Sequence, residues 1–159
     1  MPAPPLPSAR KVTLRPLRTD PASTRIFVCD DDLDFADELT CALGAGGFDV
    51  RTLRDGRTPV EVFELCRPDI VLLDIFMPPP DGFEMMNHIC QDRRAGNLAL
   101  ILLSGAEGAL LDVAAGFCRA RGMLPAATLR KPVRLDGLLQ VCRQLGGKRR
   151  ACAGGRAGK

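Results

Sequence analysis

Short, continuous apolar runs alternate along the chain with segments in which apolar residues recur at helical spacing. Residues 26–29 and 70–73 are apolar at consecutive positions, which is typical of strands buried on both faces of a sheet. Three further runs have the length and composition of strands. The pattern therefore predicts strands over residues 26–29, 48–53, 70–73, 98–103 and 127–130.

Helices are predicted between these strands. From Phe35 onward, apolar residues recur at i, i+4, i+7 and i+8, which places them on one helical face. Thr58 and Glu61 have the spacing of a capping box, with a proline at the first helical position, and this helix must end before Pro68. The predicted helices cover residues 35–43, 59–67, 83–90, 110–118 and 135–145.

Strands that alternate with helices indicate parallel βαβ units joined by right-handed crossovers. We therefore predict an α/β fold with a doubly wound, five-stranded parallel sheet and helices on both faces. The elements form one domain over residues 25–146. Residues 1–24, which are rich in Pro and Arg, are expected to be a flexible basic leader, and residues 147–159 a flexible basic tail.

Polar residues follow four of the predicted strands. They are Asp30 and Asp31 after the first strand, Asp74 after the third, Ser104 after the fourth and Lys131 after the fifth. Parallel sheets bind ligands beyond the carboxyl ends of their strands. We expect these four loops to meet in one crevice.

The side chains of this crevice suit phosphoryl transfer to a carboxylate. Three neighbouring carboxylates repel one another, and Mg²⁺, which prefers oxygen ligands, would relieve that repulsion. A carboxylate is also a competent nucleophile that forms an aspartyl phosphate. The Ser104 hydroxyl and the Lys131 ammonium would then stabilise the new phosphoryl oxygens.

The same residues resemble the receiver domains of response regulators in two-component signalling. The resemblance is carried by Asp30-Asp31-Asp32, by the pattern D-x-x-M-P-x-x-D-G over residues 74–82, by Ser104-Gly105 and by Lys131-Pro132. It covers residues 25–146 and implies a flavodoxin-like sheet with strand order 2-1-3-4-5.

The resemblance also implies the roles of individual residues. Asp74 is the expected phosphoryl acceptor. Asp31 would bind Mg²⁺ directly and Asp30 would assist through water, with the backbone carbonyl of Phe76 as a further protein ligand. Mg²⁺ is therefore the expected cofactor, held by Asp30, Asp31, Asp74 and Phe76.

Three further residues complete the implied site. Ser104 is similar to the switch hydroxyl that turns toward the phosphoryl group, and Gly105 matches the small residue that lets the phosphate approach. Lys131 would pair with the phosphoryl oxygens. The bond between Lys131 and Pro132 resembles the cis X-Pro bond of the family.

The sequence departs from the family pattern at two places. Thr128 stands three residues before Lys131, where the family usually carries an aromatic ring that takes part in the switch. The stretch between Ser104 and Lys131 is also longer than usual around residues 116–122 and is similar to receivers attached to cyclic-diguanylate phosphodiesterase domains. Both departures concern the output surface rather than the acceptor crevice.

Acidic residues concentrate in the predicted domain. Of the total net charge of +3, residues 1–25 contribute +4 and residues 146–159 contribute +5, which leaves −6 for residues 26–145. An acidic body agrees with a cation site, and basic ends agree with solvated disorder. The aromatic fraction is only 4%, without Trp or Tyr, so a platform for stacking nucleic-acid bases is not expected.

The seven cysteines form no C-x-x-C pair, and all but Cys152 lie in apolar segments. This pattern predicts small core hydrophobes in a reducing compartment rather than disulfides or a zinc site. No apolar run reaches the ~20 residues of a membrane span, and the N-terminus lacks the apolar core of a signal peptide. We expect a cytoplasmic protein without membrane contact.

The expected function is that of a stand-alone receiver without an effector domain. It would take phosphate from a sensor histidine kinase or a histidine phosphotransfer protein and signal by protein–protein binding rather than act as an enzyme. A downstream protein, or a second copy in a homodimer, would bind the surface of the 110–118 helix, the fifth strand and the last helix.

Two alternatives remain open on the sequence alone. A degenerate receiver would bind its partners without being phosphorylated. A phosphohydrolase of the haloacid-dehalogenase type would use Asp30 and Asp32, although Leu33 and Asp34 stand near where that family has Thr or Val. Labelling of Asp74 by a small phosphodonor distinguishes all three.

Overall fold

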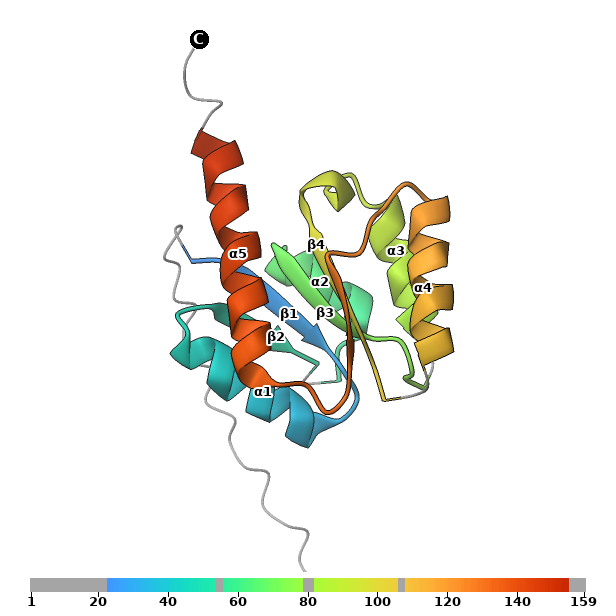
Figure 1. The fold of residues 1–159 in the computed structure, drawn as a ribbon, viewed down its shortest axis with the longest axis horizontal. Coiled ribbons are helices and arrows are strands. Elements are labelled where there is room, and N and C mark those ends of the chain that lie inside the picture. The colour runs from blue at the N-terminus through green and yellow to red at the C-terminus, as the bar shows by residue number, and fades with distance from the viewer. Residues whose placement is uncertain (1–22, 54–55, 79–81, 106–107, 155–159) are drawn as a thin grey trace, which may run out of the picture.

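The structure, a computed structural model, describes residues 23–53, 56–78, 82–105 and 108–154 (Figure 1). The strands are β1 (Arg25–Cys29), β2 (Asp49–Thr52), β3 (Ile70–Asp74), β4 (Ala99–Ser104) and β5 (Ala127–Arg130). The helices are α1 (Leu33–Ala45), α2 (Pro59–Cys66), α3 (Gly82–Gln91), α4 (Gly108–Ala120) and α5 (Leu135–Gly154), with a short 3₁₀ helix, η1 (Ala95–Asn97). The predicted elements are confirmed, with strand ends shifted by about one residue.

The strands form one parallel sheet in the order β2-β1-β3-β4-β5, which confirms the predicted fold class. β3 lies at the centre, and each of its residues is buried. Ile70 and Leu72 pack against α1 and α5, whereas Val71 and Leu73 pack with α2, α3 and α4 on the other face. The continuous apolar run of β3 thus contributes side chains to the hydrophobic cores on both faces of the sheet.

Side chains cap the N-termini of α1 and α2. The Thr58 hydroxyl accepts the Glu61 N–H at 3.3 Å, and the Glu61 carboxylate accepts the Thr58 N–H at 2.8 Å, so the predicted capping box is confirmed. The Asp32 carboxylate accepts the Phe35 N–H at 3.1 Å and caps α1, directly after the acidic loop of β1. Asp81, which its sequence position suggests as a cap for α3, lies outside the described residues.

The last helix runs past residue 146, where the domain is predicted to end, because α5 continues to Gly154. The prediction followed the apolar stripe, which stops at Leu145, but a helix extends beyond its buried face when the following residues favour helix. Residues 148–151 are Lys, Arg, Arg and Ala, all good helix formers. The predicted leader lies outside the described residues, apart from its last two positions.

Six cysteines are free: Cys29, Cys41, Cys66, Cys90, Cys118 and Cys142. Cys29, Cys118 and Cys142 are buried, and Cys66 and Cys90 are partly buried. Cys41 is exposed, so the expected core position is wrong for this residue. It lies on α1 two residues from both Leu39 and Leu43, and a two-residue step turns a side chain to the opposite helix face.

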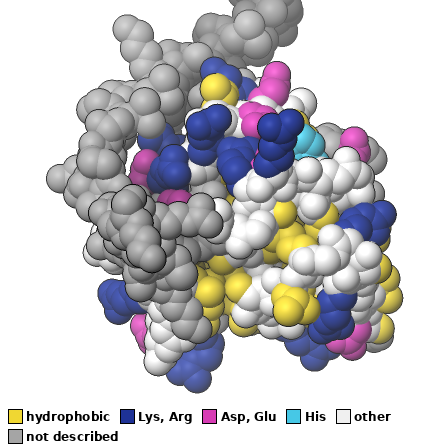
Figure 2. All heavy atoms as spheres, turned by 90° about the horizontal axis from the view of Figure 1, so that it is seen from above, with side chains coloured by type: hydrophobic (Ala, Val, Ile, Leu, Met, Phe, Trp, Pro, Cys, Tyr) yellow, Lys and Arg dark blue, Asp and Glu magenta, His cyan; other side chains and the backbone are white. Residues whose placement is uncertain are grey.

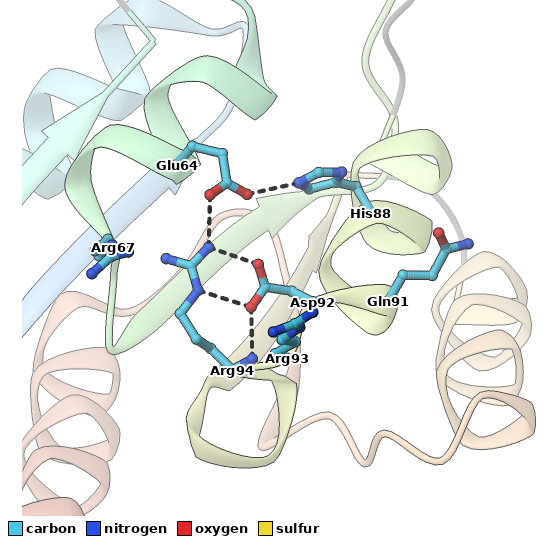
Figure 3. Close-up of a pocket in the computed structure, with 7 residues that line it drawn as sticks. All are labelled: Glu64, Arg67, His88, Gln91, Asp92, Arg93 and Arg94. Atoms are coloured by element: carbon cyan, nitrogen blue, oxygen red, sulfur yellow. Dashed lines mark hydrogen bonds and ion pairs between the residues drawn. The ribbon is translucent and has the colours of Figure 1, made fainter.

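A polar cluster joins α2, the end of α3 and the segment before η1 (Figure 3). Arg94 donates to both oxygens of Asp92, with Nε–Oδ1 at 2.8 Å and Nη2–Oδ2 at 2.6 Å. Glu64 of α2 accepts from Arg94 at 3.0 Å and contacts His88 Nε2 at 3.1 Å. The Arg94 guanidinium also lies 4.9 Å from the centre of the buried Phe63 ring.

Seen from above (Figure 2), His88, the only histidine of the chain, lies among Lys, Arg and acidic side chains. The pocket of about 520 Å³ beside it lies near the amino end of β4, whereas the predicted crevice lies at the carboxyl ends of the strands. The cluster therefore braces α2 against α3 and is separate from the predicted site.

Asp92→Asn is expected to lower the free energy of unfolding at pH 7 by about 1–2 kcal/mol. Hydrogen bonds from Arg94 hold the pKa of Asp92 at about 2, below its ordinary value. The carboxylate therefore stabilises the fold fully above about pH 4, and this contribution is lost as the pH falls toward 2. Urea unfolding of both proteins at pH 7 and pH 3 measures the difference.

Asp112→Asn on the exposed surface of α4 is the matched control, with an expected change within about 0.5 kcal/mol at either pH. If Asp92→Asn destabilises the protein as much at pH 3 as at pH 7, the carboxylate charge is not the source of the stabilisation.

Candidate functional site

The sheet brings the predicted site residues to one edge. Asp30 directly follows β1, Asp74 ends β3, Ser104 ends β4 and Lys131 directly follows β5. Because β1 and β4 both pair with β3, and β5 pairs with β4, these strand ends are neighbours. The four loops therefore converge at one edge of the sheet, as expected.

Lys131 is the centre of the site. Its Nζ donates to Asp74 Oδ2 at 2.8 Å and forms an ion pair with Asp30 Oδ2 at 2.5 Å. The Asp30 side chain is completely buried and that of Asp74 is 6% exposed. One ammonium thus offsets two buried carboxylates, which could not both remain ionised without a cation.

The other oxygen of each carboxylate is held by the backbone two residues ahead. Asp30 Oδ1 accepts the Asp32 N–H, and Asp74 Oδ1 accepts the Phe76 N–H, both at 2.9 Å. These local turns orient the carboxylates at the strand ends. The Asp74 carboxylate is therefore fixed from two sides.

Burial and ion pairing shift two pKa values in the crevice. Burial raises the pKa of Asp30 above its ordinary value, and the hydrogen bond from Lys131 opposes that shift only in part. The pKa of Lys131 is lowered by burial but raised more by its hydrogen bonds to Asp30 and Asp74, so the net shift is upward. Lys131 stays charged at neutral pH.

The carboxylates of Asp30, Asp31 and Asp74 fit a divalent cation. One oxygen from each lies within 4.8 Å of the others, and Asp31 is exposed to solvent at the rim. Asp30 Oδ2 is buried, and its partner is the Lys131 ammonium. Hard oxygen donors with an open, solvated side are what Mg²⁺ requires.

The remaining predicted residues also lie at this edge. Ser104 is fully buried, and the Lys131 N–H donates to its carbonyl at 2.9 Å. Gly105 is exposed, and an added Cβ there would meet nothing within 4 Å. Packing in the protein therefore does not require glycine at this position, and its predicted role is to leave room for the phosphate. The Phe76 side chain is 72% exposed; its predicted carbonyl contact with Mg²⁺ remains a prediction. The Lys131–Pro132 bond is cis, as the resemblance implied.

Two contributors to the site were missed by the sequence reasoning. The Phe35 ring, assigned only to the face of a helix, lies 4.7 Å from Lys131 Nζ and forms a cation–π contact. Gly82 lies so close to β3 that an added Cβ would overlap the Asp74 carbonyl oxygen and Ile75 Cα. Its place in the motif is the signal that could have indicated this close approach.

A parallel sheet of order 2-1-3-4-5 with a lysine between buried aspartates defines a phosphoacceptor receiver domain. The chain matches the response regulator receiver domain family over residues 26–143, and it therefore belongs to this family. Receiver domains of two-component systems generally bind Mg²⁺ in an acidic pocket and interact with histidine kinases or phosphotransfer proteins.

Individual relatives agree with this family. The chain is similar to the DNA-binding response regulator MtrA of Mycobacterium tuberculosis, with 34% identity over 97 residues, 61% of this chain and 41% of the relative. It is also similar to the response regulator MprA of Mycolicibacterium vanbaalenii, with 32% identity over 76% of this chain and 49% of the relative. The chain thus spans less than half the length of either relative.

Solved structures show the same fold. A CheY-like receiver domain protein from Methanospirillum hungatei matches with a TM-score of 0.68 and 22% identity, over 81% of this chain and 98% of that one. The signal receiver domain of the DNA-binding response regulator merR from Colwellia psychrerythraea matches with a TM-score of 0.65 and 25% identity, over 77% and 98%. None of the helices in the described residues combines the length and the apolar composition that a membrane span needs.

Proposed function

We propose that this receiver accepts a phosphoryl group on Asp74 from the phosphohistidine of a sensor histidine kinase or a phosphotransfer protein. The supporting observation is the Lys131 ammonium held between Asp30 and Asp74. Aspartates that are merely solvated on a loop need no such cation. A carboxylate that accepts a phosphoryl group needs one close to the negative charge of that group.

The residues of the crevice support a direct transfer. An oxygen of Asp74 would attack phosphorus, forming a P–O bond while the bond to the donor nitrogen breaks and its electron pair returns to the donor imidazole. The Phe76 N–H holds Asp74 Oδ1, which orients the nucleophile. Lys131, already 2.8 Å from Asp74 Oδ2, would pair with the phosphoryl oxygens after transfer.

Asp30, Asp31, Asp74 and the Phe76 carbonyl would hold Mg²⁺. The ion, when bound, would neutralise charge on the phosphoryl oxygens. Asp30 would then pair with the cation instead of with Lys131, and the lysine would be available to pair with the phosphate. In this proposal the chain is a signalling acceptor, not a turnover enzyme.

The proposed output is protein–protein binding through α4, β5 and α5, to a downstream protein or a second copy. Ser104 is the last residue of β4, ahead of α4, and the hydrogen bond from the Lys131 N–H to its carbonyl joins the ends of β4 and β5. Movement of Ser104 toward the phosphoryl group would therefore displace both elements. Thr128 is exposed on β5, so backbone and helix displacement would replace the movement of an aromatic ring.

Incubation with acetyl phosphate is expected to add one phosphoryl group per chain, detected by intact-protein mass spectrometry, only when Mg²⁺ is present. Asp31→Ala should reduce the labelling at a given Mg²⁺ concentration by about tenfold or more, since it removes a direct ligand. A degenerate receiver would give no adduct with Mg²⁺. A phosphohydrolase would release inorganic phosphate continuously without a stable adduct.

A further inference from the structure

Three sulfur atoms meet where α3 and α4 end, away from the acceptor crevice. Cys90 belongs to the last turn of α3, Cys118 to the last turn of α4, and Met123 lies three residues beyond the end of α4. The Cys90 thiol contacts Met123 Sδ at 3.8 Å, and the Cys90 and Cys118 thiols are within hydrogen-bonding contact. The two helices lie side by side (Figure 1).

Buried cysteine and methionine side chains commonly serve only as core filler. Cys142 has that character, since burial alone raises the pKa of its thiol to about 11. The group at Cys90 differs because each neighbouring sulfur is also a soft metal donor. Cys118 and Met123 are buried, but Cys90 is partly exposed and gives the group an open side.

We propose that Cys90, Cys118 and Met123 form a binding site for Cu(I). Two thiolates and a thioether are the donors that favour this soft cation over hard ones. A planar three-coordinate ion about 2.3 Å from each sulfur, the length of a zinc–thiolate bond, sets the sulfurs about 4 Å apart. The distance of 3.8 Å between Cys90 and Met123 already meets this requirement.

The donor count favours Cu(I) over zinc. Zinc sites in proteins have four ligands when structural and three strong nitrogen, oxygen or thiolate ligands when catalytic. Among the described residues, the group Asp30, Asp31 and Asp74 is the one set of three or more His, Cys, Asp or Glu side chains close enough to hold an ion. The sulfur site thus offers only two such ligands and a thioether.

Binding involves no oxidation. Cu⁺ replaces the two thiol protons, which leave to solvent, and the dithiolate complex carries a net charge of −1. Burial raises the pKa of both thiols, that of Cys118 to about 12, and the guanidinium of Arg121 opposes this rise only in part. Arg121 is held in place by Asn87 at 3.0 Å and by the Phe117 ring at 3.5 Å, so it can offset the negative charge.

The test is retention of copper by the reduced full chain, loaded anaerobically with a Cu(I) acetonitrile complex and challenged with the Cu(I) chelator bathocuproine disulfonate. We expect one equivalent to be retained by the wild type. Cys90→Ser and Met123→Leu should each weaken retention by about tenfold or more. Cys41→Ser, which changes an exposed thiol on α1, should retain copper like the wild type.

Both binding variants are chosen to preserve the fold, because Cys90 is at the rim and Met123→Leu nearly conserves volume. Their thermal melting without copper verifies this, and only the wild type and Cys41→Ser should gain melting temperature with Cu(I). Copper bound equally by all four proteins, or by none, would overturn the proposal. So would a Cys90–Cys118 disulfide that forms in the air-exposed protein while the reduced chain retains no copper.

Discussion

Asp74→Asn is expected to abolish phosphorylation by acetyl phosphate, with at least a hundredfold loss of adduct in the presence of Mg²⁺. The amide is a far weaker nucleophile than the carboxylate and lacks the charge that Lys131 pairs with at 2.8 Å. No other aspartate replaces it, since Asp30 is completely buried and Asp31 does not contact the lysine within the described residues. Intact mass measurement over a time course gives the result.

The fold should survive this substitution. The amide oxygen of asparagine can still accept the Phe76 N–H, and removal of one carboxylate relieves repulsion with Asp30. The free energy of unfolding should therefore change by no more than about 1 kcal/mol. Asp34→Asn, an exposed aspartate in the first turn of α1, is the control and should label normally. Undiminished labelling of Asp74→Asn would refute the acceptor assignment.

Gly82→Ala is expected to destabilise the fold by about 3 kcal/mol or more. An alanine Cβ would overlap the Asp74 carbonyl oxygen and Ile75 Cα, both backbone atoms that no rotamer change can move. Either α3 or the end of β3 must shift, and β3 carries the proposed acceptor. Labelling of the folded fraction should therefore fall together with stability. Urea unfolding and acetyl phosphate labelling measure the two effects.

Gly116→Ala is the matched control for this prediction. Gly116 lies in the middle of α4, is exposed, and an added Cβ meets nothing within 4 Å. Alanine should stabilise the protein there by about 0.5–1 kcal/mol, because it restricts the unfolded chain and favours helix. If both alanine variants are as stable as the wild type, the close approach of α3 to β3 is not a structural requirement.

Local patterns were sufficient for the elements of this fold. Continuous apolar runs identified the strands, and the spacing of Thr58 and Glu61 identified the start of α2. The positions of Asp30, Asp74 and Lys131 just beyond strands indicated a shared crevice. The order of the strands, in contrast, followed from the family resemblance, because periodicity does not specify which strands pair.

The limits of such patterns are visible at the ends of elements and in contacts. The apolar stripe of the last helix ends at Leu145, but the hydrogen-bonded helix continues to Gly154, since helix propensity does not require a buried face. Cys41 belongs to an apolar segment and is nevertheless exposed, because a two-residue step places it opposite the buried face.

The order and periodicity of side chains along the chain were enough to predict the kind of fold, the family and the residues that reach the crevice. The packed structure was needed to show that Lys131 lies between two buried aspartates, that Phe35 contacts that lysine, and that Cys90 contacts Cys118 and Met123. Such contacts join residues far apart in sequence. Their distances follow from how strands and helices pack, which no local pattern encodes.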